Sequence, residues 1–168
     1  MKVDINIQTE VNETVERCIE IVKAKWGSKV AGTMPRIEYN LKGKVAGYAY
    51  TRRNKIELHP EFLSKYKDDY ISQTVVHEYA HLAAYRLNPK GAIHGDTFMS
   101  MMRLLGAREE IYHFYSKEGV IHHWKCDHGV SMMLGVIQHK RALKSMKAHN
   151  GKPGYSRREC RCDTYRPV

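Results

Sequence analysis

The segment His77-Glu78-Tyr79-Ala80-His81 contains the side-chain types that zinc hydrolases use, at a spacing that suits them. In a helix, residues four positions apart lie on the same face, so His77 and His81 would point in the same direction. Two imidazoles placed in this way can bind one Zn²⁺ at about 2.0–2.1 Å each. Glu78 follows the first histidine and would accept a proton from the water that zinc activates. The alternative is a helix that carries two ordinary histidines, so the surrounding sequence has to decide.

A catalytic zinc ion usually takes a third protein ligand and keeps one position open. His94 is the best candidate for that ligand, because it follows His81 after twelve intervening residues. Apolar residues at helical spacing from Phe98 to Leu105 predict a second amphipathic helix, which Gly106 ends. His94 would lie at the N-terminus of this helix, where a short loop can bring it back to the first one.

The residues around the motif predict the helix that would hold both histidines rigidly. Asp68 or Asp69 is the N-cap candidate, and Asn88-Pro89 is the stop. Between them, apolar residues recur at helical spacing. These residues are Ile71, Val75, Val76, Tyr79, Leu82, Ala83 and Leu87.

Upstream of this helix the sequence predicts a long helix, three strands and a short helix. Residues 9–26 form one apolar stripe, with Thr9 as the N-cap candidate and Gly27 as the stop. Pro60 would open the short helix, which runs to Tyr66. The fold class is therefore α+β, with the strands in one short antiparallel sheet. The strands are expected at residues 36–40, 45–51 and 55–59.

Two motifs together resemble the SprT-like metalloprotease family. The family pattern is H-E-x-x-H, a loop, and then H-G-x-x-F or W. It matches residues 77–81 and the segment His94-Gly95-Asp96-Thr97-Phe98. Residues 46–50 and 56–60 resemble the hairpin that precedes the zinc helix in the family, although His59 stands where the family usually has Asn. The resemblance covers roughly residues 35–128.

This resemblance implies a zinc-dependent metalloendopeptidase with a minimal zincin-like core. His77, His81 and His94 would bind the catalytic Zn²⁺, and Glu78 would be the base that activates water. An edge strand near the metal would pair with an extended substrate. The substrate would be protein that is bound or crosslinked to DNA.

The C-terminal part of the chain differs in composition from the rest. Residues 117–168 carry 11 Lys and Arg against 4 Asp and Glu, net +7, whereas residues 1–116 carry 17 against 14, net +3. We therefore expect a metallopeptidase core at residues 1–116 and a basic segment at residues 117–168 that binds DNA or RNA. Trp124, Tyr155 and Tyr165 would stack on bases. The alternative is a basic surface that only keeps the protein soluble.

The basic segment also resembles the zinc-binding segment that follows the protease core in this family. Residues 123–126 match its first knuckle, and His149 with Cys160 matches its second half. The first knuckle lacks its second cysteine, and the C-x-C ending is narrower than structural zinc sites prefer. A degenerate ribbon without metal is the alternative to a second, structural Zn²⁺. The candidate ligands are Cys126, His149 and Cys160, with His128 or Cys162 as the fourth.

Overall composition narrows the protein's class and compartment. The net charge of +10 and the pI near 9.5 favour anionic partners, nucleic acid first. No run of about 18 apolar residues occurs, so no membrane span is expected, and the N-terminus lacks the apolar stretch of a signal peptide. Four cysteines without a secretion signal favour a reducing compartment. We expect a cytoplasmic protein, including one associated with a nucleoid or nucleus, and the sequence leaves its oligomeric state open.

Two other functions stay open at this point. A DNA-binding module could keep zinc for structure and cleave nothing, and a regulatory protein could be silent as a peptidase until a partner binds. Glu78 separates the first of these from a peptidase, because a structural zinc site needs no base beside its ligand.

Overall fold

The computed structural model describes residues 3–109, 115, 121–125, 131–135, 140, 143–144 and 166–167. The chain divides into two compact units, Met1–His113 and Phe114–Val168. The first unit combines helices with a small three-stranded sheet, so the expected α+β class is confirmed. Its elements are α1 (Ile5–Trp26), α2 (Ser28–Ala31), β1 (Arg36–Glu38), β2 (Gly47–Tyr50), β3 (Lys55–Leu58), α3 (Pro60–Lys65), α4 (Lys67–Asp69), α5 (Val76–Leu87) and α6 (Asp96–Leu104).

Helix α1 begins earlier than its apolar stripe predicts. Asp4 is the N-cap, and its carboxylate accepts a hydrogen bond from the Asn6 N–H at 2.8 Å. The expected cap, Thr9, lies inside the helix and donates its hydroxyl to the Ile5 carbonyl at 3.0 Å. Aspartate is among the strongest N-cap residues, and at Asp4 it lets the helix take in one more turn. Gly27, at φ +81°, ends the helix as expected.

The sheet is mixed rather than antiparallel throughout, which corrects the prediction. Its strand order is β1-β3-β2; β2 runs antiparallel to β3, but β1 runs parallel to it. The connection between β1 and β2, residues 39–46, is long enough to cross the two strand spacings, about 10 Å, that separate them. Strand β3 therefore enters between the other two. Its inward side chains, Ile56 and Leu58, are fully buried, as the central position requires.

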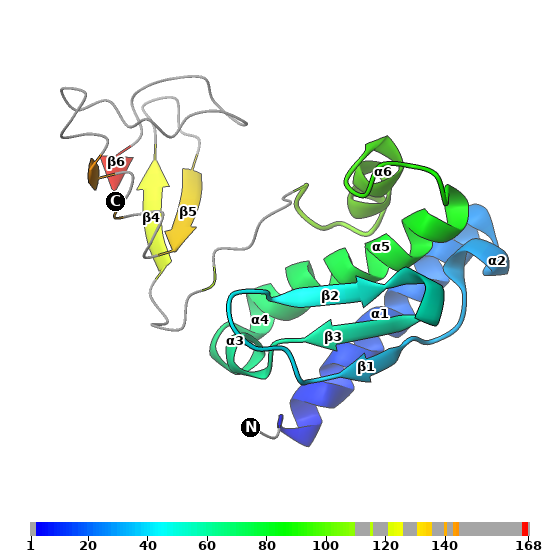
Figure 1. Cartoon of the computed structure of the whole chain (residues 1–168), viewed down its shortest axis with the longest axis horizontal. Helices are drawn as coiled ribbons and strands as arrows, with labels where there is room; N and C mark the ends of the chain where they lie inside the picture. The colour runs from blue at the N-terminus through cyan, green and yellow to red at the C-terminus, as the bar shows by residue number, and fades with distance from the viewer. Residues whose placement is uncertain are drawn as a thin grey trace. The chain divides into compact units, whose positions relative to one another are not determined.

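Helices α1 and α5 cover one face of this sheet (Figure 1). The core between them is apolar, and burying each of its large side chains contributes about 1.5–3 kcal/mol. Fully buried examples are Val15, Val22, Ile56, Leu58, Tyr79 and Leu82. This apolar layer holds α5, the helix that carries His77 and His81, firmly against strand β2.

The helix that carries His77 starts before the predicted caps. Asp69 has helical backbone angles, so neither it nor Asp68 is an N-cap; the chain enters α4 at Lys67. A π-helical segment, Tyr70–Val75, then leads directly into α5. Such wide turns occur often at functional sites. The predicted stop is confirmed, since α5 ends at Leu87.

Tyr70 connects this wide turn to the sheet. It is fully buried, and its hydroxyl donates to the Ala46 carbonyl while accepting the His59 N–H at 2.8 Å. Ala46 directly precedes β2, and His59 directly follows β3. Tyr70 therefore connects the π-helical segment that leads into α5 with the start of β2 and the end of β3.

The second unit contains strands β4 (Ile121–Lys125), β5 (Ser131–Gly135) and β6 (Arg166–Pro167). Both β5 and β6 pair antiparallel with β4. Trp124 on β4 is only 1% exposed. The prediction that Trp124 stacks on bases is therefore wrong for this conformation, because its ring packs inside the protein. In the described part of the chain, no helix is long and apolar enough to cross a membrane.

Candidate metal centre

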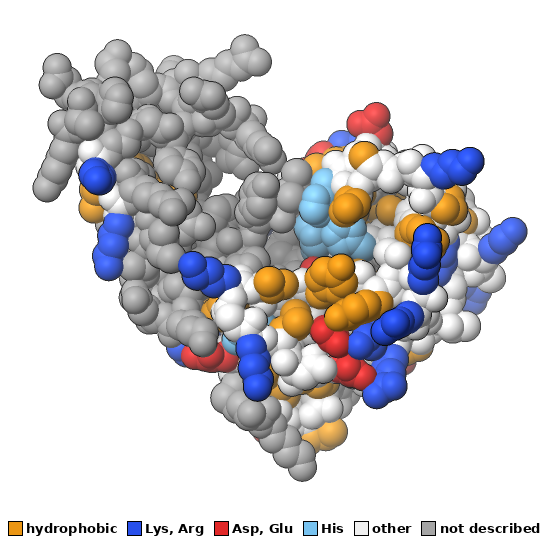
Figure 2. Space-filling view, viewed as in Figure 1, with side chains coloured by type: hydrophobic (Ala, Val, Ile, Leu, Met, Phe, Trp, Pro, Cys, Tyr) orange, Lys and Arg blue, Asp and Glu red, His pale blue; other side chains and the backbone are white. Residues whose placement is uncertain are grey.

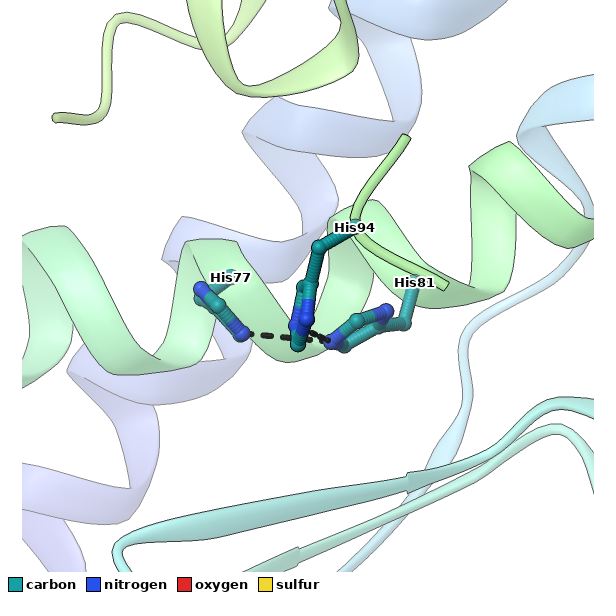
Figure 3. Close-up of side chains that lie close together, drawn as sticks. All are labelled: His77, His81 and His94. Carbon is teal, nitrogen blue, oxygen red and sulfur yellow. Dashed lines mark hydrogen bonds between the residues drawn. The ribbon is translucent and has the colours of Figure 1, made fainter. Parts of the chain in front are cut away.

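Three histidine rings converge on one point beside helix α5 (Figure 3). His77 and His81 project from α5, and His94 reaches them from the loop before α6. The Nε2 atom of His81 lies 3.1 Å from that of His77 and 3.2 Å from that of His94. One ring nitrogen from each residue lies within 4.8 Å of the others. These are the three residues that the motif spacing predicts as ligands.

The spacing of these nitrogens fits a tetrahedral metal ion. Ligands at 2.0–2.1 Å from zinc and at tetrahedral angles would lie about 3.3 Å apart. The two measured separations are within a few tenths of an ångström of that value. Three nitrogen ligands with room for a fourth are the donor set of a catalytic zinc site. The cluster can therefore hold a metal ion, and zinc suits its donors.

The protonation of the rings agrees with this use. Burial, reinforced by the neighbouring His77 and His94, lowers the pKa of His81 to about 3. Burial also lowers the pKa of His94. Both rings are therefore neutral at physiological pH, which is the form of imidazole that binds metals.

Phe98 packs against all three histidine rings. Its own ring is buried, and it stacks on His81 with the ring centroids 4.4 Å apart. It meets the rings of His77 and His94 edge-on, at 4.9 Å in each case. The sequence marked Phe98 as a motif residue and a helix-core residue but did not indicate this role. The aromatic position at the end of the H-G-x-x-F pattern was the available signal.

The loop that carries His94 is a succession of tight turns. The Gly91 N–H donates to the Asn88 carbonyl at 3.0 Å, and the Gly95 N–H donates to the Ala92 carbonyl at 3.0 Å. A Cβ atom on Gly95 would lie 3.0 Å from the Ala92 side chain, so the second turn favours glycine. These turns reverse the chain over a few residues and return His94 to α5.

The Glu78 side chain lies against strand β2, where a Cβ atom on Gly47 would be 2.6 Å from its Cγ and Oε1 atoms. It is 6% exposed, and its carboxylate accepts a hydrogen bond from the backbone N–H of Ala49. Burial raises the pKa of Glu78 to about 8, and the Ala49 bond opposes this shift. A divalent cation beside it would favour the ionised carboxylate and lower this pKa. The pKa of Glu78 would therefore depend on whether a metal ion is bound beside it.

Strand β2 forms one edge of the sheet beside this carboxylate. The Ala46 carbonyl accepts from the His59 N–H at 2.9 Å, on the side of β3. Because peptide groups alternate along a strand, those of Gly47 and Ala49 face the free edge. The family resemblance led us to expect an edge strand near the metal, in the segment where Gly47 and Ala49 alternate with two tyrosines. Gly47 and Ala49 are the residues of β2 whose main-chain groups face this edge.

The model of the SprT-like family matches residues 11–118 of this chain. The chain belongs to the SprT-like family. The match includes α5, His94 and α6, so the family assignment covers the whole histidine cluster. The resemblance seen in the two motifs is thus confirmed.

Three relatives show how far the similarity of this SprT-like chain extends. It is 33% identical over 119 residues to Protein SprT of Glaesserella parasuis serovar 5, covering 66% of this chain and 76% of that protein. It is 30% identical over 98 residues to Protein SprT of Pasteurella multocida, covering 58% of each. The match to Protein SprT of Vibrio atlanticus is weaker, at 25% over 146 residues, but covers 84% of this chain and 86% of that protein. No solved structure matches this chain.

His59 is where this SprT-like chain departs from the usual asparagine. The residue is buried and is the N-cap of α3, and its Nδ1 accepts the Phe62 N–H at 3.4 Å. Its ring also stacks on that of Phe62, at 4.0 Å. Asparagine is a favoured N-cap residue, so His59 can supply the same local hydrogen bond.

The predicted second zinc site lies outside the described residues. It remains a prediction, as do its alternatives. The candidate ligands concerned are Cys126, His128, His149, Cys160 and Cys162.

Proposed function

We propose that this SprT-like chain is a zinc-dependent metalloendopeptidase. The observation that supports this best is the convergence of His77, His81 and His94 on the helix that also carries the buried Glu78. Structural zinc sites usually close with four protein ligands, whereas catalytic ones use three and leave a position open. Among the described residues, three ligands gather here, and each ring is partly exposed. Figure 2 shows a cluster of histidine side chains, in pale blue, on the described surface.

A bound zinc ion would polarise the scissile carbonyl and acidify a water molecule. Glu78 would take the proton of that water on its carboxylate and pass it to the nitrogen of the leaving amine. The N–H of Ala49 would hold one part of the carboxylate in place during both transfers. Burial between α5 and β2 keeps bulk water from competing for the same proton.

The substrate would lie along the free edge of β2. An extended peptide can add to such an edge through main-chain hydrogen bonds, which require no particular sequence. The N–H and C=O of Gly47 and the C=O of Ala49 would be its partners, next to the base. A site of this kind is tolerant of sequence and needs another source of selectivity.

Nucleic acid would supply that selectivity. The basic segment, residues 117–168, carries a net charge of +7 and would hold DNA or RNA. Proteins bound or crosslinked to the same strand would reach the site at a raised local concentration. The proposed substrates are therefore proteins attached to nucleic acid.

The test combines metal analysis with a cleavage assay on the full chain. We expect close to one catalytic zinc per chain, cleavage of an unfolded protein such as casein, and faster cleavage when single-stranded DNA is added. Chelation should stop cleavage, and zinc should restore it. Bound zinc with no cleavage in either condition would favour a structural role for the metal instead.

A further inference from the structure

The outer face of the sheet carries an aromatic pair that the peptidase site does not use. Side chains alternate along a strand. Gly47 and Ala49 face α5, because a Cβ atom on Gly47 would run into Glu78. Tyr48 and Tyr50 therefore project from the opposite face. Their ring centroids lie 4.7 Å apart, and Tyr48 is 53% exposed.

The second ring of the pair is held in place by a network on the same face. The Tyr50 hydroxyl donates to Glu57 at 3.0 Å. The Lys55 ammonium donates to the same carboxylate at 2.6 Å and lies 4.2 Å from the centre of the Tyr50 ring. These contacts orient Tyr50, and Tyr50 in turn supports the exposed ring of Tyr48.

The acidic groups on this face already have cationic partners. Glu57 bonds to Lys55, and Glu38 bonds to Arg36 at 2.6 Å and to Lys55 at 3.4 Å. A polyanion that approached the face would therefore meet few uncompensated negative charges. Figure 2 shows hydrophobic, acidic and basic side chains side by side over the sheet.

Further basic residues stand at both ends of β2. Lys42 and Lys44 precede the strand, and Arg52 and Arg53 follow it. All four are exposed, and within the described residues no ion pair involves them. Residues 36–59 carry six basic and two acidic residues, net +4, whereas the rest of residues 1–116 carries 11 and 12, net −1. The net positive charge of residues 1–116 is thus concentrated in the segment that forms the sheet and its connections.

We propose that this outer face binds single-stranded nucleic acid, with a base stacked on Tyr48 and phosphates on the basic residues at the two ends of β2. Base stacking on aromatic rings tolerates any sequence, and it needs bases that are free of a duplex. Charge complementarity selects a polyanion over an apolar peptide.

This inference goes beyond the proposed function, because it places a nucleic-acid contact in the unit that holds the histidines. One consequence does rest on the proposed function. Strand β2 would bind nucleic acid through its outer face and substrate through its edge. A protein attached to the bound nucleic acid would then be presented directly to Glu78.

The first test measures binding of a fluorescent oligothymidylate of about 15 nucleotides to the full chain by anisotropy. Tyr48→Ala should weaken binding about 5- to 150-fold, because one stacked base is lost. Tyr48→Phe is the matched control and should bind like the wild type, since it keeps the ring. Equal affinities for all three proteins would overturn the proposal.

The second test separates phosphate contacts from general charge. Arg52→Ala/Arg53→Ala should reduce the slope of log K against log salt by about 1.4, the value for two phosphates on a single strand. Lys25→Ala/Lys29→Ala removes the same charge from exposed positions on α1 and α2 and should leave the slope unchanged. Equal slopes for both double variants would overturn the assignment of these arginines.

The third test locates the contact when the basic segment also binds. An oligonucleotide with 5-iododeoxyuridine is photocrosslinked to the full chain, and the modified residue is identified by mass spectrometry. A crosslink at Tyr48 is expected, and crosslinks confined to residues 117–168 would overturn the proposal. None of these measurements depends on cleavage. The same binding should be seen with Glu78→Gln and after zinc is removed, so failure of the peptidase assignment would be recognised separately.

Discussion

Gly47 has no room for a side chain, because a Cβ atom there would lie 2.6 Å from both Cγ and Oε1 of Glu78. The edge strand and the candidate base are thus in direct contact. We predict that Gly47→Ala displaces the carboxylate and slows cleavage by about 10²-fold or more, as loss of a general base does. Zinc content, measured by atomic absorption, should stay at the wild-type level.

A double-variant comparison shows whether the loss passes through Glu78. Gly47→Ala combined with Glu78→Gln should cleave no more slowly than Glu78→Gln alone, because both changes disable one group. Tyr48→Ala, on the same strand but the opposite face, should keep normal cleavage of a peptide without nucleic acid. Additive losses would mean that Gly47 acts elsewhere.

Glu78→Gln should abolish proteolysis while leaving zinc bound and the protein folded. The amide keeps the shape of the side chain but cannot take a proton from water. The expected loss is about 10²–10⁴-fold in rate. The measurements are cleavage rate, zinc content and thermal unfolding on one preparation. Wild-type cleavage by this variant would rule out Glu78 as the base.

The stability of the zinc-free protein should fall between about pH 4.5 and pH 8 because of Glu78. Its pKa is about 8 in the folded protein against an ordinary value of 4.5, so the folded state keeps a proton that the unfolded state releases. The stabilisation is complete below the lower value and is lost as the pH rises through the higher one. A shift of this size corresponds to at most about 5 kcal/mol.

Urea unfolding of zinc-free wild type and Glu78→Gln at pH 5 and pH 8 isolates this effect. His81 has its pKa lowered to about 3, so it makes stability rise with pH between about 3 and 6.5, but it does so in both proteins. The wild type should lose more stability than the variant between the two pH values. Parallel behaviour of the two proteins would show that Glu78 is solvated.

His94→Ala should remove the third ligand and lower zinc affinity sharply. With only His77 and His81 left, the donor set falls below that of known catalytic sites. Zinc competition with a chromophoric chelator measures the effect. His123→Ala is the matched control, since His123 is exposed on β4 and belongs to no metal cluster found in the described part of the chain. Unchanged zinc affinity in His94→Ala would refute the ligand assignment.

Removing the basic segment should separate metal binding from regulation by nucleic acid. A chain that ends at Ser116 should retain the catalytic zinc but lose most affinity for DNA and most DNA-stimulated cleavage. If the lost segment contacts about five phosphates, its contribution falls on the order of 10²-fold for a fourfold rise in salt. A salt titration of both chains, with cleavage measured in parallel, checks this. Equal affinities of the two chains for DNA would show that the segment is only a basic surface.

The local part of the metal centre follows from the sequence alone. The spacing of His77 and His81 places them on one helix face whatever the rest of the chain does, because helical periodicity depends on the backbone. His94 follows closely enough for a short loop to return it. The family motif adds the third ligand and the neighbouring Glu78, so the histidine cluster could be predicted in full.

Only the tertiary structure decided what surrounds that centre. Strand order depends on pairing between distant segments, and the burial of Ile56 and Leu58 placed β3 in the middle, which made β1 parallel to it. The contact between Gly47 and Glu78 joins residues 31 positions apart, and no local pattern encodes it. The sequence thus determined which residues could bind the metal, whereas the packing of α5 on the edge strand decided the environment of the base, because desolvation and steric contact arise only between elements.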